Sequence, residues 1–402
     1  MLSGRGSLSL TRAISRDDFK AMAEAETKPL SDDERLDWLR LIRSENVGPV
    51  VFRQLLERYG RPAAALEALP ELARRAGGKR QIRLCSPPEA EAEVAAARKA
   101  GVRLVALCEP AYPGLLRNLD DAPPVLALLG NLETLDPPSV GIVGARNASA
   151  NGRRLAGRLA AELAEAGFAV TSGMARGIDT AAHLGALPRP TVAVLAGGVD
   201  VVYPPENAAL HADIARQGAV ISEMPLGTVP QARHFPRRNR LISGLALGVV
   251  VVEAAKRSGS LITARFAGDQ GREVFAVPGS PLDPRAGGCN QLIREGATLI
   301  ESAADVIEAL GSLRRPERVA SGAPRSLAQA VPPPPEPGNA ERAIIEELLG
   351  AEPIQVDDVV RQSSLPIAVV HGVLLELELA GKAERHPGNR FARLYKAPAD
   401  PL

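Results

Sequence analysis

The sequence predicts an α/β protein with a Rossmann-like, doubly wound and mostly parallel sheet, flanked by an N-terminal helical domain and a C-terminal winged-helix domain. Between about residues 88 and 310, short apolar runs alternate with helical segments, a pattern typical of parallel strands buried on both faces. A Pro-rich stretch then separates a last group of helices and a hairpin. The 402 residues are enough for two or three domains.

The composition is that of a globular protein, with 45% hydrophobic and 24% charged residues. The net charge is only +1, so a nucleic-acid partner would require basic residues gathered in one place. Three widely spaced cysteines (Cys85, Cys108, Cys289) form neither a disulfide framework nor a zinc motif. No apolar run reaches the roughly 18 residues of a membrane span, and no signal-peptide pattern opens the chain. We therefore expect a cytoplasmic protein without a membrane partner.

The N-terminal part divides into a polar segment and a helical one. Residues 1–30 are predicted to be a disordered extension, and residues 31–86 a SAM- or helix-hairpin-helix-like domain that opens with a capping box at Ser31. The run ENVGPVVFRQLLERYG places a glycine turn at Gly48 between two helices. Such hairpins aim backbone N–H groups at DNA phosphates, but Pro49 removes one donor, and a small helical packing module is the alternative.

Residues 87–311 form the extended Rossmann-like domain, in which each apolar run is followed by a helical segment. The predicted strands are 102–107, 140–144, 168–173, 191–197, 218–223, 248–254, 273–279 and 297–300, and the predicted helices are 149–166, 176–187, 205–217, 236–246, 260–271, 288–296 and 302–310.

Residues 312–340 are predicted to be a Pro-rich linker, and residues 341–402 a winged-helix domain. The expected recognition helix, 367–380, contains no Lys or Arg but contains Glu376 and Glu378. A helix that enters the major groove usually carries cations, so we expect little DNA recognition from this one. A protein–protein or dimer-organising role is the alternative. The wing carries four cations that could contact a phosphate backbone: Arg385, Arg390, Arg393 and Lys396.

Ligands of such sheets bind at the carboxyl ends of the strands, and here the loops at those ends are rich in Gly, Ser and Arg. The stretch 233–240 holds five basic side chains and no acid: Arg233, His234, Arg237, Arg238 and Arg240. Phe235 and Tyr203 could stack on unpaired bases. The pattern predicts a local polyanion site, with a merely solvated loop as the alternative.

Enzyme-like constellations are sparse. Asp179 and His183 have helical spacing and could form an acid/base pair, or they could be a helix-capping and a packing residue. Glu223 and Glu253 end predicted strands as catalytic carboxylates or as partners of an arginine or a loop amide. There is no dinucleotide fingerprint, Walker motif or metal-site spacing. We therefore expect a protein that is not an enzyme, without cofactor or metal.

Six runs together resemble the DNA-processing protein A (DprA/Smf) family in order and spacing over residues 105–305. They are VGIVGARNASANG, SGMARGIDTAAHLGAL, TVAVLAGGVDVVYPPEN, ISEMPLGTVPQARHFPRRNRLISGLA, VVVEAAKRSGSLITARFAGDQGREVFAVPG and LIREGATLI. The resemblance implies a single-stranded-DNA-binding recombination mediator. Such a protein forms homodimers through its Rossmann-like domain, protects incoming single strands and loads the recombinase RecA onto them during natural transformation.

The resemblance also implies a set of DNA-binding residues on the matching motifs. They are Arg146, Ser172, Gly173, Arg176, Gly177, Phe235, Arg237, Asn239, Arg240, Lys256, Ser258, Gly259 and Ser260. Arg146 and Arg176 are the expected phosphate contacts, and arginine stands at position 176 where some relatives have lysine.

Two other functions compete with this interpretation. A Rossmann-like nucleotide-processing enzyme of the LOG-type phosphoribohydrolase class would carry a PGGxGTxxE run, where this chain has VVVEAAKRSGSLITA. A transcription regulator would need a winged helix that recognises DNA, and the cation-free helix 367–380 counts against it.

Overall fold

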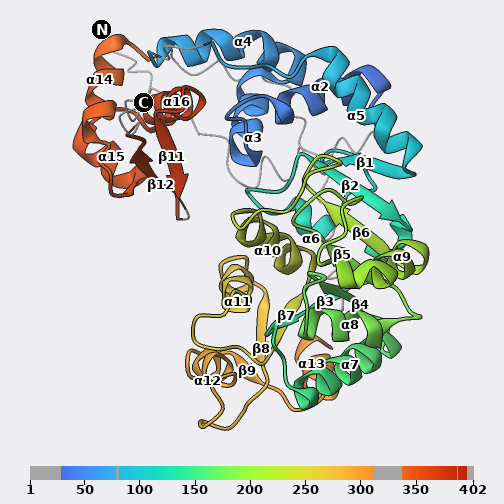
Figure 1. Cartoon of the computed structure of the whole chain (residues 1–402). Helices are drawn as coiled ribbons and strands as arrows, with labels where there is room; N and C mark the ends of the chain where they lie inside the picture. The colour runs from blue at the N-terminus through green and yellow to red at the C-terminus, as the bar shows by residue number, and fades with distance from the viewer. Residues whose placement is uncertain (1–28, 78–80, 312–336, 387, 396–402) are drawn as a thin grey trace, which may run out of the picture.

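The computed structural model describes residues 29–77, 81–311, 337–386 and 388–395. The helices of the N-terminal part, a large mixed sheet with its covering helices, and the elements of the C-terminal part follow one another along the chain (Figure 1). The predicted extension 1–30 and linker 312–340 lie almost wholly outside the described residues, as does Lys396 of the wing.

The central sheet has nine strands in the order β1-β2-β6-β5-β4-β3-β7-β8-β9. All neighbours from β6 to β9 are parallel, whereas β1 and β2 are joined to them antiparallel at one edge. The predicted Rossmann-like, mostly parallel sheet is therefore confirmed. The strands are β1 (Val102–Ala106), β2 (Val125–Gly130), β3 (Ser139–Gly144), β4 (Ala169–Ser172), β5 (Thr191–Val194), β6 (Ala219–Ser222), β7 (Gly248–Val252), β8 (Glu273–Ala276) and β9 (Thr298–Leu299).

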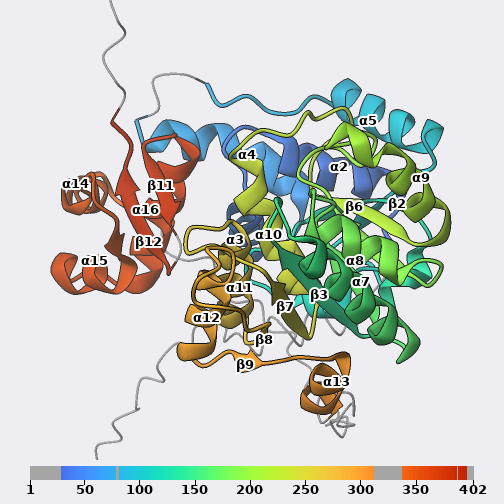
Figure 2. The same ribbon diagram turned by 60° about the horizontal axis from the view of Figure 1, so that its bottom comes forward.

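Apolar side chains of the central strands feed two cores, one on each face of the sheet. In β7, Val249 and Val251 pack toward one face and Val250 and Val252 toward the other. The first face is covered by α6 (Gly114–Arg117), α10 (His234–Leu245), α11 (Ser260–Asp269) and α12 (Gly287–Arg294), and the second by α7 (Ala150–Glu165), α8 (Ile178–Ala186), α9 (Ala208–Gln217) and α13 (Ala303–Gly311). Figure 2 shows α10, α11 and α12 on one side of β3 and β7, and α7 and α8 on the other.

The eight predicted strands are all present, but β2, the second strand from one edge of the sheet, was not predicted. Its sequence, VLALLG, is an apolar run whose first four residues are buried. Two 3₁₀ turns, η1 (Leu132–Leu135) and η2 (Pro205–Asn207), complete the loops of this domain. Because β2 pairs antiparallel with both β1 and β6, the sheet gains an antiparallel edge that the alternation of strands and helices does not indicate.

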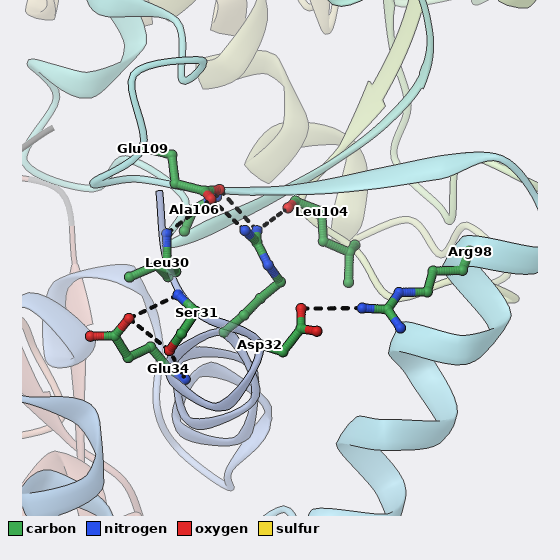
Figure 3. Close-up of polar contacts among 9 residues, drawn as sticks. Leu30, Ser31, Asp32, Glu34, Arg98, Leu104, Ala106 and Glu109 are labelled. Atoms are coloured by element: carbon green, nitrogen blue, oxygen red, sulfur yellow. Dashed lines mark hydrogen bonds and ion pairs between the residues drawn. The ribbon is translucent and has the colours of Figure 1, made fainter. Parts of the chain in front are cut away.

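The N-terminal helices are α2 (Asp32–Arg43), α3 (Pro49–Tyr59), α4 (Pro62–Arg75) and α5 (Pro87–Lys99). The capping box at Ser31 is confirmed, since the Ser31 amide donates to Glu34 at 2.8 Å. Polar contacts join these helices to the sheet and to one another: Arg35 of α2 pairs with Glu109 just beyond β1, and Asp32 of α2 pairs with Arg98 of α5 at 3.2 Å (Figure 3).

The C-terminal elements form the predicted winged helix, with α14 (Asn339–Leu348), α15 (Val356–Ser363) and α16 (Ile367–Leu379) around a three-stranded sheet. That sheet has the order β10-β12-β11, built from β10 (Ile354–Gln355), β11 (Ala383–His386) and β12 (Arg390–Arg393). Ile345, Val359 and Phe391 lie at the centre of its core. Among the described residues, no helix has the length and apolar content needed to cross a membrane.

Candidate functional site

The strand order reverses direction between β3 and β7, which lie side by side at the middle of the sheet. In open α/β sheets the crevice beyond the carboxyl ends of two such strands is where ligands bind. The loop after β3 carries Arg146, and the loop after β4 carries Arg176. The sheet topology therefore directs the predicted cationic loops to one edge.

An aromatic ring contacts two guanidinium groups at this edge. Phe235, in the first turn of α10, has the Arg146 Cζ 5.0 Å from its ring centroid and the Arg238 Cζ 5.9 Å from it. The ring of Tyr203 is tilted by 57° against Phe235 at a centroid distance of 5.6 Å and is 45% exposed. Cations over a ring face are attracted by its quadrupole, so Arg146 and Phe235 orient each other. The two aromatic residues that the sequence offered as stacking surfaces thus lie in one cluster with Arg146.

Arg238 lies next to this cluster and holds it to the sheet. Its side chain is buried, and its Nη1 donates to the carbonyl of Gly173 at 2.5 Å and to that of Val194. Burial lowers the pKa of the Arg238 guanidinium to about 10, which leaves it charged at neutral pH. Burial also raises the pKa of the nearby Asp179 carboxyl to about 6, while the charge of Arg238 opposes that shift. Because Arg238 bonds the ends of β4 and β5, it connects the aromatic cluster to the sheet.

The loop after β4 is held on its other side by Asp179. The Asp179 carboxylate accepts from the amides of Gly173 at 3.2 Å and Ala175 at 3.3 Å. Gly177 has φ +80°, and a Cβ there would lie 2.3 Å from the Ala145 carbonyl oxygen, so the loops after β3 and β4 are in close backbone contact.

Glu223, at the end of β6, binds two arginines of α10. It accepts from Arg240 at 2.5 Å and pairs with Arg237 at 3.2 Å. Arg240 is buried and also donates to the Asp121 carbonyl at 2.7 Å, whereas Arg237 is about half exposed. Of these two predicted DNA-binding residues, Arg240 is therefore a structural group, and Arg237 keeps a surface available to a ligand.

The other expected phosphate contact, Arg176, is exposed and forms an ion pair with Glu206. The hydrogen bond from Arg176 lowers the pKa of the Glu206 carboxyl. Ser172 is fully buried, and its hydroxyl donates to the Ile142 carbonyl at 2.6 Å. The hydroxyl of Ser172, one of the predicted DNA-binding residues, is thus used inside the sheet.

Lys256, Ser258, Gly259 and Ser260 lie at the start of α11 and form a second group. The hydroxyls of Ser258 and Ser260 are 2.7 Å apart, and Asn239 of α10 donates to the Gly259 carbonyl at 3.3 Å. Lys256, Ser258 and Gly259 line a cleft of about 680 Å³ between α11 and α12, which Arg146 and Phe235 do not line. Arg146 and Phe235 therefore lie in the aromatic cluster, whereas Lys256, Ser258 and Gly259 line a separate cleft.

The enzyme-like residues use their polar groups within the structure. His183 is fully buried with its Nδ1 2.8 Å from the Thr191 hydroxyl, and burial lowers its pKa to about 3. Glu253 accepts from the Ser149 amide at 2.8 Å and from its hydroxyl. It therefore lies at the N-terminus of α7, where dinucleotide-binding folds place a phosphate. Within the described residues there is no cluster of His, Cys, Asp and Glu that could hold a metal ion.

Sequence reasoning did not foresee two of these arrangements. The buried role of Arg238 was not distinguished from the other arginines of the 233–240 stretch, although in the helix it follows Phe235 by three residues and so shares its face. The contact between Glu253 and Ser149 joins residues 104 apart in the chain, and the sequence carries no signal for it.

Comparison with known proteins matches this architecture over almost all of the described chain. The family model for DNA recombination-mediator protein A matches residues 103–311, which is more than half of the chain. The chain belongs to the DNA recombination-mediator protein A (DprA/Smf) family. Models for the DprA-like N-terminal HHH domain and the DprA winged helix domain match residues 32–96 and 328–389.

Curated relatives and a solved structure agree with the family assignment. Protein Smf of Synechocystis is 36% identical over 71% of this chain and 78% of its own, and Protein Smf of Escherichia coli is 42% identical over 71% and 76%. The X-ray structure of DprA from Streptococcus pneumoniae superposes with a TM-score of 0.58 at 35% identity, covering 70% of this chain and 98% of its own. The chain is thus a DNA-processing protein of the recombination-mediator class, and both the family and the three-part fold predicted from the sequence are confirmed.

Proposed function

We propose that the chain binds single-stranded DNA, in the service of DNA recombination, at the surface around Arg146, Phe235 and Tyr203 beyond the carboxyl ends of β3, β4 and β5, which is called the crevice below. The observation that carries the proposal is the exposed Arg146 beside the ring of Phe235, with Tyr203 against the same ring. Proteins that hold single strands combine backbone-tracking cations with aromatic rings on which bases stack. In this crevice both components come from loops and a helix start that the buried Arg238 anchors to the sheet.

The charge of the crevice suits a phosphate backbone rather than a particular base sequence. Arg146 and Arg176 are exposed on neighbouring loops, and the half-exposed Arg237 lies on α10. Arginine contacts to phosphate carry no sequence information, and stacking tolerates every base. We therefore expect binding with little sequence preference.

The nucleotide-processing alternative is disfavoured by Glu253. A mononucleotide bound to this fold would place its phosphate against the amides that open the first helix after β3. There the carboxylate of Glu253 already accepts the Ser149 amide and hydroxyl, and a Cβ on Gly152 would lie 2.5 Å from the Glu253 Cδ. A phosphate would have to displace this carboxylate, which is positioned by a Glu253 backbone in the left-handed conformation at φ +58°.

Family membership supports the finer parts of the proposal. We propose that the chain acts in the cytoplasm as a homodimer formed through its Rossmann-like domain, and that it protects incoming single strands and loads RecA onto them during transformation. In this role the protein is a mediator with no catalytic step of its own, and it needs neither cofactor nor metal.

Fluorescence anisotropy with labelled oligonucleotides tests the site directly. The full chain is titrated with single-stranded and duplex DNA of one sequence over a salt series, and the Arg146→Ala/Arg176→Ala variant is compared with it. We expect the wild type to prefer the single strand and the variant to lose affinity at least tenfold. Its log–log salt slope should fall by roughly 1.4, because each phosphate contact on a single strand contributes about 0.7.

A variant of equal charge provides the control. Arg158 and Arg189 are exposed and each pairs with a carboxylate on the α7–α8 side, away from the crevice. Arg158→Ala/Arg189→Ala therefore removes the same net charge, and we expect an affinity within twofold of the wild type. Equal losses in the two double variants would show that only net charge matters and would refute the crevice assignment.

A further inference from the structure

The would-be recognition helix α16 is mostly apolar, and two different parts of the chain cover it. Val370, Val373 and Leu374 pack inside the winged helix itself. Leu375 and Leu379, which are 4% and 1% exposed, instead belong to the core of the N-terminal helices. In both views α16 lies beside α4 (Figures 1 and 2). A helix with so few polar positions is one that is mostly buried.

Polar contacts fix the same interface at the hairpin between α2 and α3. The Asn46 side chain, on a residue at φ +60° in the hairpin turn, donates to the Leu379 carbonyl at 2.9 Å. Arg385 of the wing lies 3.4 Å from the Gln54 side-chain oxygen in α3. The C-terminal end of α16, with its partial negative charge, therefore sits against the turn that a helix-hairpin-helix motif would present to a phosphate.

Amides of the hairpin are also occupied within the N-terminal helices. The Glu45 amide donates to the Arg83 carbonyl at 2.9 Å, and the Val47 amide to that of Ser44 at 3.3 Å. Pro49 has no amide hydrogen. These three positions of the turn therefore have no free backbone N–H group to donate to a phosphate.

The acidic residues of α16 are engaged as well. Glu376 is fully buried and pairs with Arg342 of α14 at 2.6 Å, and Glu378 pairs with Arg385 at 3.3 Å. Recognition of the major groove needs an exposed helix face with donors for base edges and phosphates. Outside the winged-helix core, Leu375 and Leu379 of α16 meet the N-terminal helices instead.

We infer that the two potential duplex-binding motifs of this chain, the α2–α3 hairpin and α16, are each other's binding partners. The winged helix is then a docking module that fastens the C-terminal part to the N-terminal helices, and duplex DNA engages neither motif. This inference stands apart from the single-strand site, because none of its residues lies in the crevice.

Hydrogen–deuterium exchange on the full chain tests the inference, using Leu375→Asp to put a charge into the interface. We expect exchange in 62–75 of α4 and in 44–48 to rise at least tenfold, while exchange in α14 changes by less than twofold. Affinities for duplex and single-stranded DNA should stay within twofold of the wild type. Ile367→Asp is the control, since Ile367 is on the same helix but 51% exposed, and it should leave exchange in α4 unchanged.

Three outcomes would overturn the inference: unchanged exchange in α4 on Leu375→Asp, a duplex affinity that falls fivefold or more in that variant, or slower exchange in 367–379 when duplex is added to the wild type. Asn46→Gly covers the case in which Leu375→Asp does not fold. It removes the donor to Leu379 while keeping the left-handed turn, and exchange at 44–48 should rise about threefold.

Discussion

Gly177 offers a way to displace Arg146 without touching it. A Cβ at residue 177 would lie 2.3 Å from the Ala145 carbonyl oxygen and 2.6 Å from that of Arg146, both of them backbone atoms. Since real contacts of this kind stay above 3.0 Å, Gly177→Ala must push the two loops apart by about 0.7 Å or more. The Arg146 guanidinium, 5.0 Å from the Phe235 centroid, would move with its loop.

The free energy of unfolding that Gly177→Ala loses has two parts, one from the backbone conformation and one from overpacking, and a matched variant separates them. Alanine in the left-handed region costs roughly 1–2 kcal/mol, of which the stiffer unfolded chain returns about 0.4–1 kcal/mol. Gly177, with φ +80° and ψ −117°, lies outside that region, so its backbone cost is at least as large. Gly101→Ala has only the backbone part, because Gly101 has φ +68° and a Cβ added there would meet no atom within 4 Å. Overpacking adds about 1–3 kcal/mol at Gly177 alone.

Urea unfolding and single-strand anisotropy measure the two effects. We expect Gly177→Ala to unfold with a free energy about 1–3 kcal/mol below that of Gly101→Ala and to bind the single strand at least tenfold more weakly, a change of about 1.4 kcal/mol. A Gly177→Ala protein that binds within twofold of Gly101→Ala would refute the claim that the two loops jointly place the cationic site.

Three further outcomes follow from the contacts of the site. Phe235→Leu should weaken single-strand binding about fivefold or more, while Phe235→Trp should retain it, because stacking contributes about 1–3 kcal/mol per base; equal affinities in anisotropy would contradict the stacking role. Glu253→Ala should free the α7 N-terminus, so that millimolar phosphate raises its Tm but not that of the wild type; no difference would contradict the assignment of Glu253 to the anion position. The pKa of His183 is depressed to about 3, so the stability that the neutral imidazole contributes is complete above about pH 6.5 and is lost as the pH falls. The pKa of Asp179 is raised to about 6, so this carboxyl instead adds stability as the pH falls below about 6. The free energy of unfolding should therefore drop between pH 7 and pH 5 by about 2 kcal/mol more in the wild type than in His183→Gln, and parallel urea curves at the two pH values would contradict this.

Much of the fold could be predicted because apolar runs and glycine-rich turns are local signals. The alternation from 140 to 300 predicted the parallel strands, and the loops at their carboxyl ends pointed to Arg146 and Phe235, which the structure brings within 5.0 Å. Strand β2 was missed because the alternation of strands and helices does not indicate its antiparallel pairing with β1 and β6.

The site was less predictable where burial decides a residue's role. Arg237, Arg238 and Arg240 are similar in sequence, yet only Arg237 is exposed, because the helix turns the other two toward Gly173, Val194 and Glu223. The sequence pattern also did not predict that α16 packs against the N-terminal helices. Its lack of Lys and Arg predicts little DNA recognition, and only the structure identifies the N-terminal helices as what covers it.

Photo-crosslinking tests the central claim most directly. A single strand that carries 5-iodouracil is bound to the full chain, irradiated, and the crosslinked peptides are identified by mass spectrometry. We predict crosslinks at Phe235 and Tyr203, the two rings of the crevice, and their loss in Arg146→Ala at matched protein concentration. Crosslinks confined to the wing or to the α11–α12 cleft, with none at either ring, would contradict the account.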